Sequence, residues 1–328
     1  MSSLWLITTY FNPLGWRSRR DNYHTFRRHL DARLLTVSWS PEGNHELEEG
    51  DADILIRVDG GDLMWQKERL INIGLAHLPD DCDLVGWVDC DILFQEPSWQ
   101  QQAIALLRAH QVIQLYGAVE YLEAGSPIDA GFRSSLRRSS MLQAWCTAED
   151  PNRQILDHLQ MREALTKEGQ YSPQSDEHSA GLAWAAQRTW LEAMGGLPDR
   201  AIIGGGARDL ACALLGCWEA YAASMQRRGL GRYCSEQSRQ WAQKAQSSAP
   251  HLGCLDGTIL HLHHGDLVDR SYLQRQFDLL RTGFLPDGHL ERDLAGAWRF
   301  NDAAPAQTRQ LMAGYFRSRR EDGTEAAI

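Results

Sequence analysis

The chain has 328 residues, of which 43% are hydrophobic, so it can form one large α/β domain or two small ones. Its formal net charge of -10 argues against a polymeric nucleic-acid partner, which usually requires a basic face. No apolar run approaches the roughly 20 residues that a membrane span requires, and no basic segment followed by an apolar core opens the chain as a signal peptide would.

The first third of the sequence alternates between strand and helix patterns. Short apolar runs predict three strands, over residues 4–9, 34–39 and 53–58. The spacing of apolar residues predicts two helices, over residues 17–30 and 64–78. This alternation indicates a parallel sheet with crossover helices, and ligands collect at the carboxyl edge of such sheets. The first helix is basic, and its arginines either meet phosphates at that edge or form a solvated face.

Two aspartates interrupt an apolar run at residues 84–94, LVGWVDCDILF. Burying a carboxylate is costly unless it is paired or binds a metal. Two carboxylates at the end of a buried strand suit Mg²⁺ or Mn²⁺, which often also touch substrate phosphates. The alternative is that Asp89 and Asp91 only cap a strand and begin a turn.

Residues 65–94 as a whole resemble a known family. The stretch WQKERLINIGLAHLPDDCDLVGWVDCDILF is similar to the segment around the D-x-D motif of GT-A nucleotide-sugar glycosyltransferases, in particular the β-1,4-galactosyltransferase group and related family-2 enzymes. The resemblance implies that Asp91 binds the metal and that Asp89 contacts the nucleotide ribose or the metal. Three polar residues before the motif either contact the nucleotide or the aspartate strand, or are structural: Lys67, Arg69 and Asn72.

The middle of the chain is less informative. A helix and then a strand are predicted from residue 103 to residue 115, and a second helix over residues 153–167. Between them, Arg133, Arg137 and Arg138 stand among serines. This segment is interpreted either as a surface insertion or flexible loop, or, from the resemblance, as part of the acceptor site.

Residues 181–215 carry a second part of the resemblance. Gly195 to Asp199 and Gly206 to Asp209 stand where the family has Gly-Gly-Phe-Asp/Glu and Gly-Ala-Glu-Asp. The resemblance implies that Asp209 is the general base of an inverting reaction. A carboxylate at a helix N-terminus is stabilised by the macrodipole, which also supports the alternative that Asp209 is only a cap. Arg208 replaces the family's Glu and could meet an anionic acceptor or a phosphate.

A histidine-rich segment follows a predicted strand at residues 258–260. The run HLHHG contains His261, His263 and His264. A late histidine completes the metal site in many enzymes of this fold, and the resemblance assigns that role to His261, with His263 as second choice. Strand alternation would place these two on one face. A histidine-only zinc site is a weaker alternative. Beyond it, a helix is predicted over residues 271–281, and a disordered charged tail over residues 318–328.

These patterns and the resemblance together predict a single α/β domain of GT-A (Rossmann-like) fold over residues 1–300, with a mixed, mostly parallel sheet flanked by helices. Residues 1–115 would bind the nucleotide-sugar and residues 116–300 the acceptor, followed by a C-terminal helical segment and tail, 301–328. The implied activity is metal-dependent inverting transfer of a sugar from a nucleoside diphosphate, with UDP expected, to the hydroxyl of a glycan, lipid-linked glycan, protein or metabolite.

Two other classes stay open. A non-catalytic nucleotide-sugar or glycan-binding relative would keep the fold without the activity. A nucleotidyltransferase ranks lowest, because no glycine-rich, lysine-bearing loop follows the first strand. Seven cysteines without a C-x-x-C pair indicate reduced thiols, and hence a cytoplasmic protein.

Overall fold

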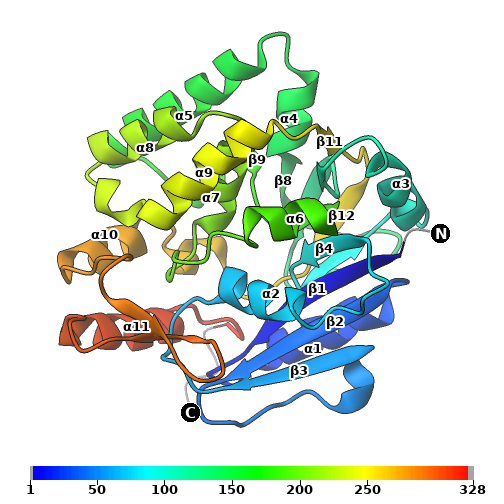
Figure 1. Cartoon of the computed structure of the whole chain (residues 1–328), viewed down its shortest axis with the longest axis horizontal. Helices are drawn as coiled ribbons and strands as arrows, with labels where there is room; N and C mark the ends of the chain where they lie inside the picture. Colours follow the sequence, from blue (N-terminus) through cyan, green and yellow to red (C-terminus); the bar gives the residue numbers. More distant parts are fainter. Residues whose placement is uncertain (1–2, 324–328) are drawn as a thin grey trace.

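A seven-stranded sheet forms the centre of the computed structural model, which describes residues 3–323 (Figure 1). Its strand order is β11-β6-β10-β4-β1-β2-β3. The strands are β1 (Leu4–Phe11), β2 (Arg33–Ser40), β3 (Ile54–Asp59), β4 (Leu84–Val88), β6 (Val112–Gln114), β10 (Ala183–Gln187) and β11 (Leu252–Cys254). Only β10 runs antiparallel to its neighbours in this sheet. The predicted α/β class with a mixed, mostly parallel sheet is therefore confirmed.

Helices cover both faces of this sheet, and the strands are accordingly apolar on both sides. Trp5 and Ile7 of β1 belong to the hydrophobic cluster that includes α2, whereas Leu4 and Leu6 belong to the cluster that includes α1. In Figure 1, α2 and α6 lie in front of the sheet and α1 lies behind it. The helices are α1 (Arg17–Arg28), α2 (Lys67–Leu75), α3 (Trp99–Leu106), α4 (Met141–Thr147), α5 (Pro151–Lys167), α6 (Arg188–Met194), α7 (Gly206–Leu214), α8 (Trp218–Arg227), α9 (Glu236–Ser248), α10 (Gln274–Arg281) and α11 (Ala306–Ser318).

A second sheet of five strands, in the order β5-β12-β7-β8-β9, adjoins the first. Its strands are β5 (Ile92–Phe94), β7 (Ala118–Leu122), β8 (Ser134–Ser140), β9 (His178–Ser179) and β12 (Thr258–His261), and a separate hairpin joins β13 (Leu290–Arg292) to β14 (Trp298–Phe300). The apolar run at residues 84–94 therefore forms two strands in two different sheets. Asp89, Cys90 and Asp91 make the turn between them. The serine-arginine segment, interpreted as a surface insertion or loop, instead forms β8 inside this sheet.

The order of the main sheet reverses between β1 and β4. From β1 the chain moves outward through β2 and β3, and it then returns to β4 on the other side. In open α/β sheets, ligands bind beyond the carboxyl ends of the strands at such a switch point. Here β1 ends at Phe11 and β4 ends at Val88, immediately before Asp89.

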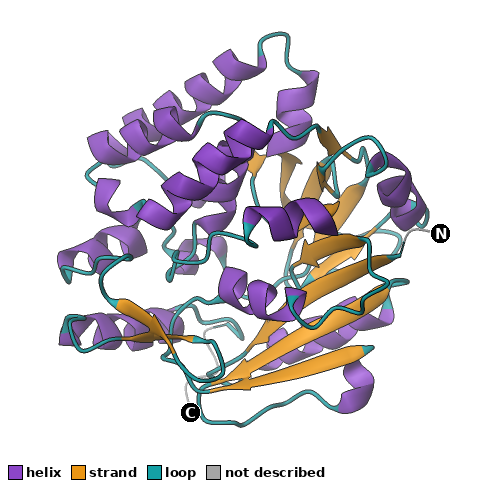
Figure 2. Ribbon diagram, viewed as in Figure 1, coloured by secondary structure: helices purple, strands orange, loops and turns teal. Residues whose placement is uncertain are grey.

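The C-terminal region packs against this core. Met312, Tyr315 and Phe316 of α11 belong to the larger hydrophobic cluster. Figure 2 shows the helices in purple around the strands in orange. The prediction of a disordered tail is wrong for residues 318–323, because Glu321 is only 3% exposed and pairs with buried arginines. The rest of the predicted tail, residues 324–328, lies outside the described residues. Between residues 3 and 323, no helix is both long and apolar enough to cross a bilayer, and all seven cysteines are free thiols.

Candidate active site

A cavity of about 250 Å³ opens at the switch point of the main sheet, where Phe11 of β1 and Asp89 after β4 both line it. Its wall is strongly basic although the whole chain is acidic. Among residues 3–323, nine cationic side chains line it: Arg19, Lys67, Arg138, Arg162, Arg208, Arg228, Arg270, Arg275 and Arg319. Four carboxylates from the same range do so: Glu68, Asp89, Asp91 and Asp176. A cleft lined by an excess of one charge attracts ligands of the opposite charge, so this cavity favours an anionic ligand.

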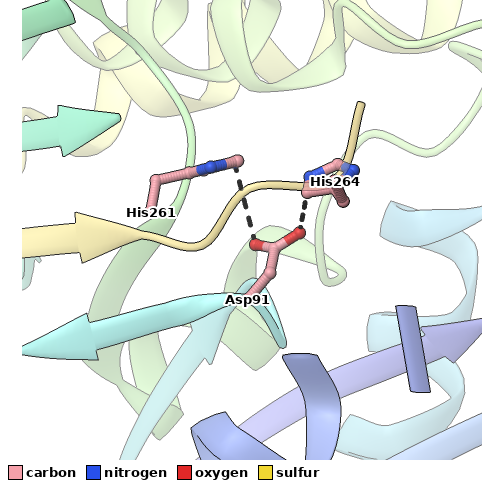
Figure 3. A group of neighbouring side chains, drawn as sticks. All are labelled: Asp91, His261 and His264. Atoms are coloured by element: carbon pink, nitrogen blue, oxygen red, sulfur yellow. Dashed lines mark ion pairs between the residues drawn. The ribbon is translucent and has the colours of Figure 1, made fainter. Parts of the chain in front are cut away.

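Asp91, His261 and His264 form a compact group on the cavity wall (Figure 3). Asp91 lies in the turn after β4, His261 ends β12, and His264 follows three residues later. The Nε2 atoms of His261 and His264 lie 3.9 Å and 2.9 Å from the two carboxylate oxygens of Asp91. The buried Oδ1 of Asp91 has no hydrogen-bond partner among the described residues. One carboxylate and two imidazoles, with a carboxylate oxygen left unpaired, fit a divalent cation such as Mn²⁺.

His263, the second choice for the metal, does not join this group. Strand β12 ends at His261, so the alternation expected beyond that residue does not continue. The His263 ring is 31% exposed, and its Nε2 lies 3.7 Å from Asp266. His264 takes the position instead, and its Nδ1 lies 3.5 Å from Glu321 in the tail. A carboxylate on the far nitrogen of a ligating histidine fixes the ring orientation.

The two aspartates of the motif have different surroundings. Lys67 donates a hydrogen bond to Asp89 Oδ1, and Asp89 is absent from the group around Asp91. Burial raises the pKa of Asp91, but the neighbouring His261 and His264 outweigh that effect and hold its pKa well below the usual range. Asp91 is thus kept ionised, while Asp89 is paired with a lysine that also lines the cavity.

Arg69 and Asn72 lie away from the cavity wall and fix a loop. Arg69 Nη1 and Asn72 Nδ2 both donate to Asp199 Oδ2 at 3.1 Å. A Cβ at Gly196 would lie 2.4 Å from Asn72 Oδ1, so glycine is required there. These contacts favour the structural alternative for Arg69 and Asn72.

Asp209 is buried beside the cavity but does not line it. Its Oδ1 accepts a hydrogen bond from Tyr221 Oη at 2.8 Å, and Tyr221 does line the cavity. Burial raises the pKa of Asp209 to about 7, against the opposing effect of the Tyr221 hydrogen bond. The position is the fourth residue of α7, so Asp209 is not the cap of that helix, which is Gly205.

Glu68 is a site residue that the sequence analysis missed. It lies on α2 next to Lys67, lines the cavity, and burial raises its pKa to about 7. A Cβ at Gly206 would lie 2.8 Å from Glu68 Oε1, so the glycine at the start of α7 allows this close approach. Its place in the apolar spacing of α2 gave no sign of a functional role.

Comparison with known proteins gives limited sequence similarity. No family model matches the chain. A match of 67 residues, 20% of the chain, is 34% identical to a probable nicotinate-nucleotide adenylyltransferase of Leifsonia xyli subsp. xyli (strain CTCB07). That match spans only 30% of the relative's length.

Several solved structures resemble the chain over most of its length. Glucosyl-3-phosphoglycerate synthase from Mycobacterium tuberculosis, in complex with Mn²⁺, UDP and phosphoglyceric acid, is 13% identical with a TM-score of 0.38, covering 88% of this chain and 81% of the other. The catalytic domain of Drosophila beta-1,4-galactosyltransferase 7 with xylobiose is 9% identical with a TM-score of 0.37, covering 95% and 99%. The 4-diphosphocytidyl-2C-methyl-D-erythritol synthase from Anaerococcus prevotii DSM 20548 is 12% identical with a TM-score of 0.32, covering 78% and 87%. The first two are glycosyltransferases, the class that the sequence resemblance names, but at these TM-scores no residue role is transferred from them.

Proposed function

We propose that this protein transfers a sugar from a nucleoside-diphosphate donor, with UDP as the expected nucleotide, to an acceptor hydroxyl. The observation that carries the proposal is the basic cavity at the sheet's switch point, with Asp91, His261 and His264 gathered on its wall. A diphosphate carries negative charge that this wall complements. Asp91, His261 and His264 would hold a divalent cation, which would supply Lewis-acid stabilisation for the charge of the leaving nucleotide.

Arginines next to the Asp91 group supply further positive charge for the diphosphate. Arg270 Nη2 lies 3.0 Å from His264 Nε2, and Arg275 Nη1 donates to the backbone oxygen of Arg270 at 3.3 Å. The Nε atoms of both arginines are buried without a hydrogen-bond partner among the described residues. Donor binding is accordingly assigned to the Asp91 side of the cavity. Residues 1–115 supply the carboxylates of the motif, and the later half supplies the histidines and the acceptor side.

Inverting transfer requires a base on the acceptor side. The acceptor oxygen forms a bond to the anomeric carbon, the bond from that carbon to the diphosphate oxygen breaks, and the hydroxyl proton goes to a carboxylate. Asp209 is proposed as this carboxylate, acting through the Tyr221 hydroxyl that separates it from the cavity. Glu68 is the competing assignment, because it lines the cavity directly. Asp209→Asn and Glu68→Gln distinguish the two through turnover with donor binding unchanged.

Nucleotidyl transfer is the second candidate, since the partial match to a probable adenylyltransferase names that chemistry. The loop after β1, NPLGWRSRR, has no lysine and a single glycine for cradling a triphosphate. The two functions release different products: a nucleoside diphosphate from sugar transfer, and pyrophosphate from nucleotidyl transfer.

The test measures both products from UDP-, GDP- and dTDP-sugars and from nucleoside triphosphates, with and without Mn²⁺. The wild type is compared with Asp91→Ala and His264→Ala, and His263→Ala is the matched control because its ring lies outside the group. We expect metal-dependent diphosphate release from one donor, lost in the first two variants and kept in the control. The proposal would be excluded if no nucleotide-sugar reacted and none bound in calorimetry. Release of pyrophosphate from a nucleoside triphosphate would favour nucleotidyl transfer.

A further inference from the structure

Four arginines outside the Asp91 group line the cavity together. They come from four different places in the fold: Arg138 from β8, Arg162 from α5, Arg208 from α7, and Arg228 from the C-cap position after α8. Arg138, Arg162 and Arg228 are each no more than 8% exposed. Convergence from elements so far apart in sequence is not the pattern of a solvated helix face.

Among the described residues, one carboxylate forms ion pairs with members of this cluster. Asp176 forms ion pairs with Arg162 and, at 3.3 Å, with Arg208. The nearby Glu163 is engaged elsewhere, by Lys167 and Arg227 at 2.8 Å each. Positive charge is therefore in excess, and burying unpaired charge is costly.

The hydrogen-bonding capacity of these arginines is also incompletely used. Arg138 donates to the backbone oxygen of Pro173, but its buried Nε has no partner among the described residues. Arg228 Nε donates to Thr166 at 3.0 Å, and its buried Nη2 is likewise unpartnered within residues 3–323. Burial, together with the charge of Arg208, lowers the pKa of Arg162 to about 9. Each of these features would be relieved by an anion.

A metal ion is a poor occupant of this region. His158, Glu177 and His178 lie close enough to share an ion. However, the charges of Arg208, Arg162 and Arg138 all act on His158, and Arg208 Nη1 lies 3.1 Å from its Nε2. Burial and the charge of Arg208 lower the pKa of His158 to about 2, so the ring is neutral and adds nothing to balance the arginines. A cation would be repelled by the same charges.

We propose that Arg138, Arg162, Arg208 and Arg228 bind a phosphate or carboxylate group, so that the acceptor is an anionic hydroxyl compound. Guanidinium groups bind both anions through paired hydrogen bonds. Tyr121 lies between this arginine cluster and the Asp91 group. Arg138 Cζ lies 5.2 Å from the centre of the Tyr121 ring, and the centre of the His261 ring lies 4.9 Å from the same point. An anion held by the cluster would thus place the rest of a small acceptor toward the donor. The acceptor assignment rests on the proposed function; the anion site itself does not.

The first test measures the binding of inorganic phosphate to the full chain by calorimetry, without metal or donor. Arg208→Gln and Arg228→Gln should each weaken binding about tenfold or more, since each removes a charge-assisted hydrogen-bond donor. Arg227→Gln is the matched control, because Arg227 precedes Arg228 but is 52% exposed and pairs with Glu163. Thermal melting checks that each variant is folded, and Arg208→Lys and Arg228→Lys, which keep the charge, should bind better than the glutamine variants. Arg275→Gln, on the donor side, reports any phosphate bound there, and its effect should be smaller than that of Arg208→Gln or Arg228→Gln.

The anion site would be overturned if neither Arg208→Gln nor Arg228→Gln weakened phosphate binding, or if only Arg275→Gln did. This outcome does not depend on what the protein transfers.

The second test compares glycerol, glycerol 3-phosphate and glycerate as acceptors for the identified donor. A preference for one anionic compound that falls in Arg228→Gln supports the acceptor assignment and separates phosphate from carboxylate. No preference over glycerol would overturn it. Phosphate binding that depends on the arginines, without transfer from any donor, would sustain the anion site and reject the proposed function.

Discussion

Replacing Asp209 by Asn should make the stability of this protein less dependent on pH between pH 5 and pH 8. The Asp209 side chain lies in a protein interior where its charged form is poorly solvated, and its pKa rises from 3.8 to about 7. The amide of Asn is nearly isosteric. Its oxygen can still accept the hydrogen bond from Tyr221, while the group can no longer ionise.

The sign follows from proton binding. Between pH 3.8 and about 7, the folded protein holds a proton on Asp209 that the unfolded chain has lost, so stability falls as the pH rises through this window. The contribution is fully present below pH 3.8 and is lost once the pH passes about 7. From pH 5 to pH 8, the loss is about 2–3 kcal/mol. With an unfolding entropy of about 2.1 cal/mol/K per residue, this corresponds to a difference of about 4 °C in Tm for a chain of this length.

The assay is thermal unfolding of wild type and Asp209→Asn across that pH range. The Tm of the variant relative to wild type should rise by about 4 °C between pH 5 and pH 8. Glu68, whose pKa is also about 7, is present in both proteins, and its charge is one of the causes that raise the pKa of Asp209. Ser238→Ala removes a 3.4 Å hydrogen bond to Asp209 Oδ2 that lowers the pKa of this group, but it leaves the carboxylate. Its stability should therefore still fall as the pH rises, unlike that of Asp209→Asn. Parallel curves for wild type and Asp209→Asn would show that Asp209 titrates normally and would refute the reasoning.

Three further outcomes are expected. Asp91→Ala should abolish Mn²⁺ binding measured by calorimetry, because it removes the carboxylate of the Asp91 group. Retention of full Mn²⁺ affinity would contradict the proposed metal site. Glu321→Gln leaves the buried Arg319 without its carboxylate partner and should lower the free energy of unfolding by about 3–5 kcal/mol in urea titration; a loss below 1 kcal/mol would count against a buried ion pair. Gly196→Ala should destabilise the protein more than Gly195→Ala. Both glycines have φ above +80°, but only at Gly196 would an added Cβ lie close to another atom, at 2.4 Å from Asn72 Oδ1. Equal losses of Tm in thermal melts would show that backbone strain alone determines the effect.

Much of the fold was predictable because its signals are local. Apolar runs of strand length and helical spacing repeat along the first third of the chain. The central strands β1, β2 and β4 are buried on both faces, so their apolar runs are nearly continuous. The break at Asp89 to Asp91 was harder to interpret, since the same apolar run continues into β5. Nothing within the run shows that Ile92 leaves the sheet of β4 and pairs with His261 in the second sheet.

The candidate site residues that belong to short sequence motifs could be predicted from the sequence. Residues that reach the cavity from distant segments could not. Asp91 and His261 follow apolar strands, and the structure brings them together. The sequence predicted His263 as the second choice, whereas the structure places His264 beside Asp91, because β12 ends at His261. The alternation of side chains along a strand does not show where the strand ends. Glu68 is hidden in a helix pattern, and it reaches the site only because Gly206 lets α7 approach.

The charged tail shows most clearly how distant segments complete the site. Its composition predicts disorder, yet Asp322 accepts hydrogen bonds from the backbone N–H groups of Arg17 and Ser18 at 2.9 Å and 2.7 Å. Those groups open α1, which has no side-chain cap of its own, so a carboxylate from the other end of the chain satisfies them and complements the helix dipole. The preceding Glu321 accepts from Arg19 at 2.9 Å and lies beside His264. The wall that carries Asp91, His261 and His264 is therefore completed by contacts between residues from both ends of the described chain.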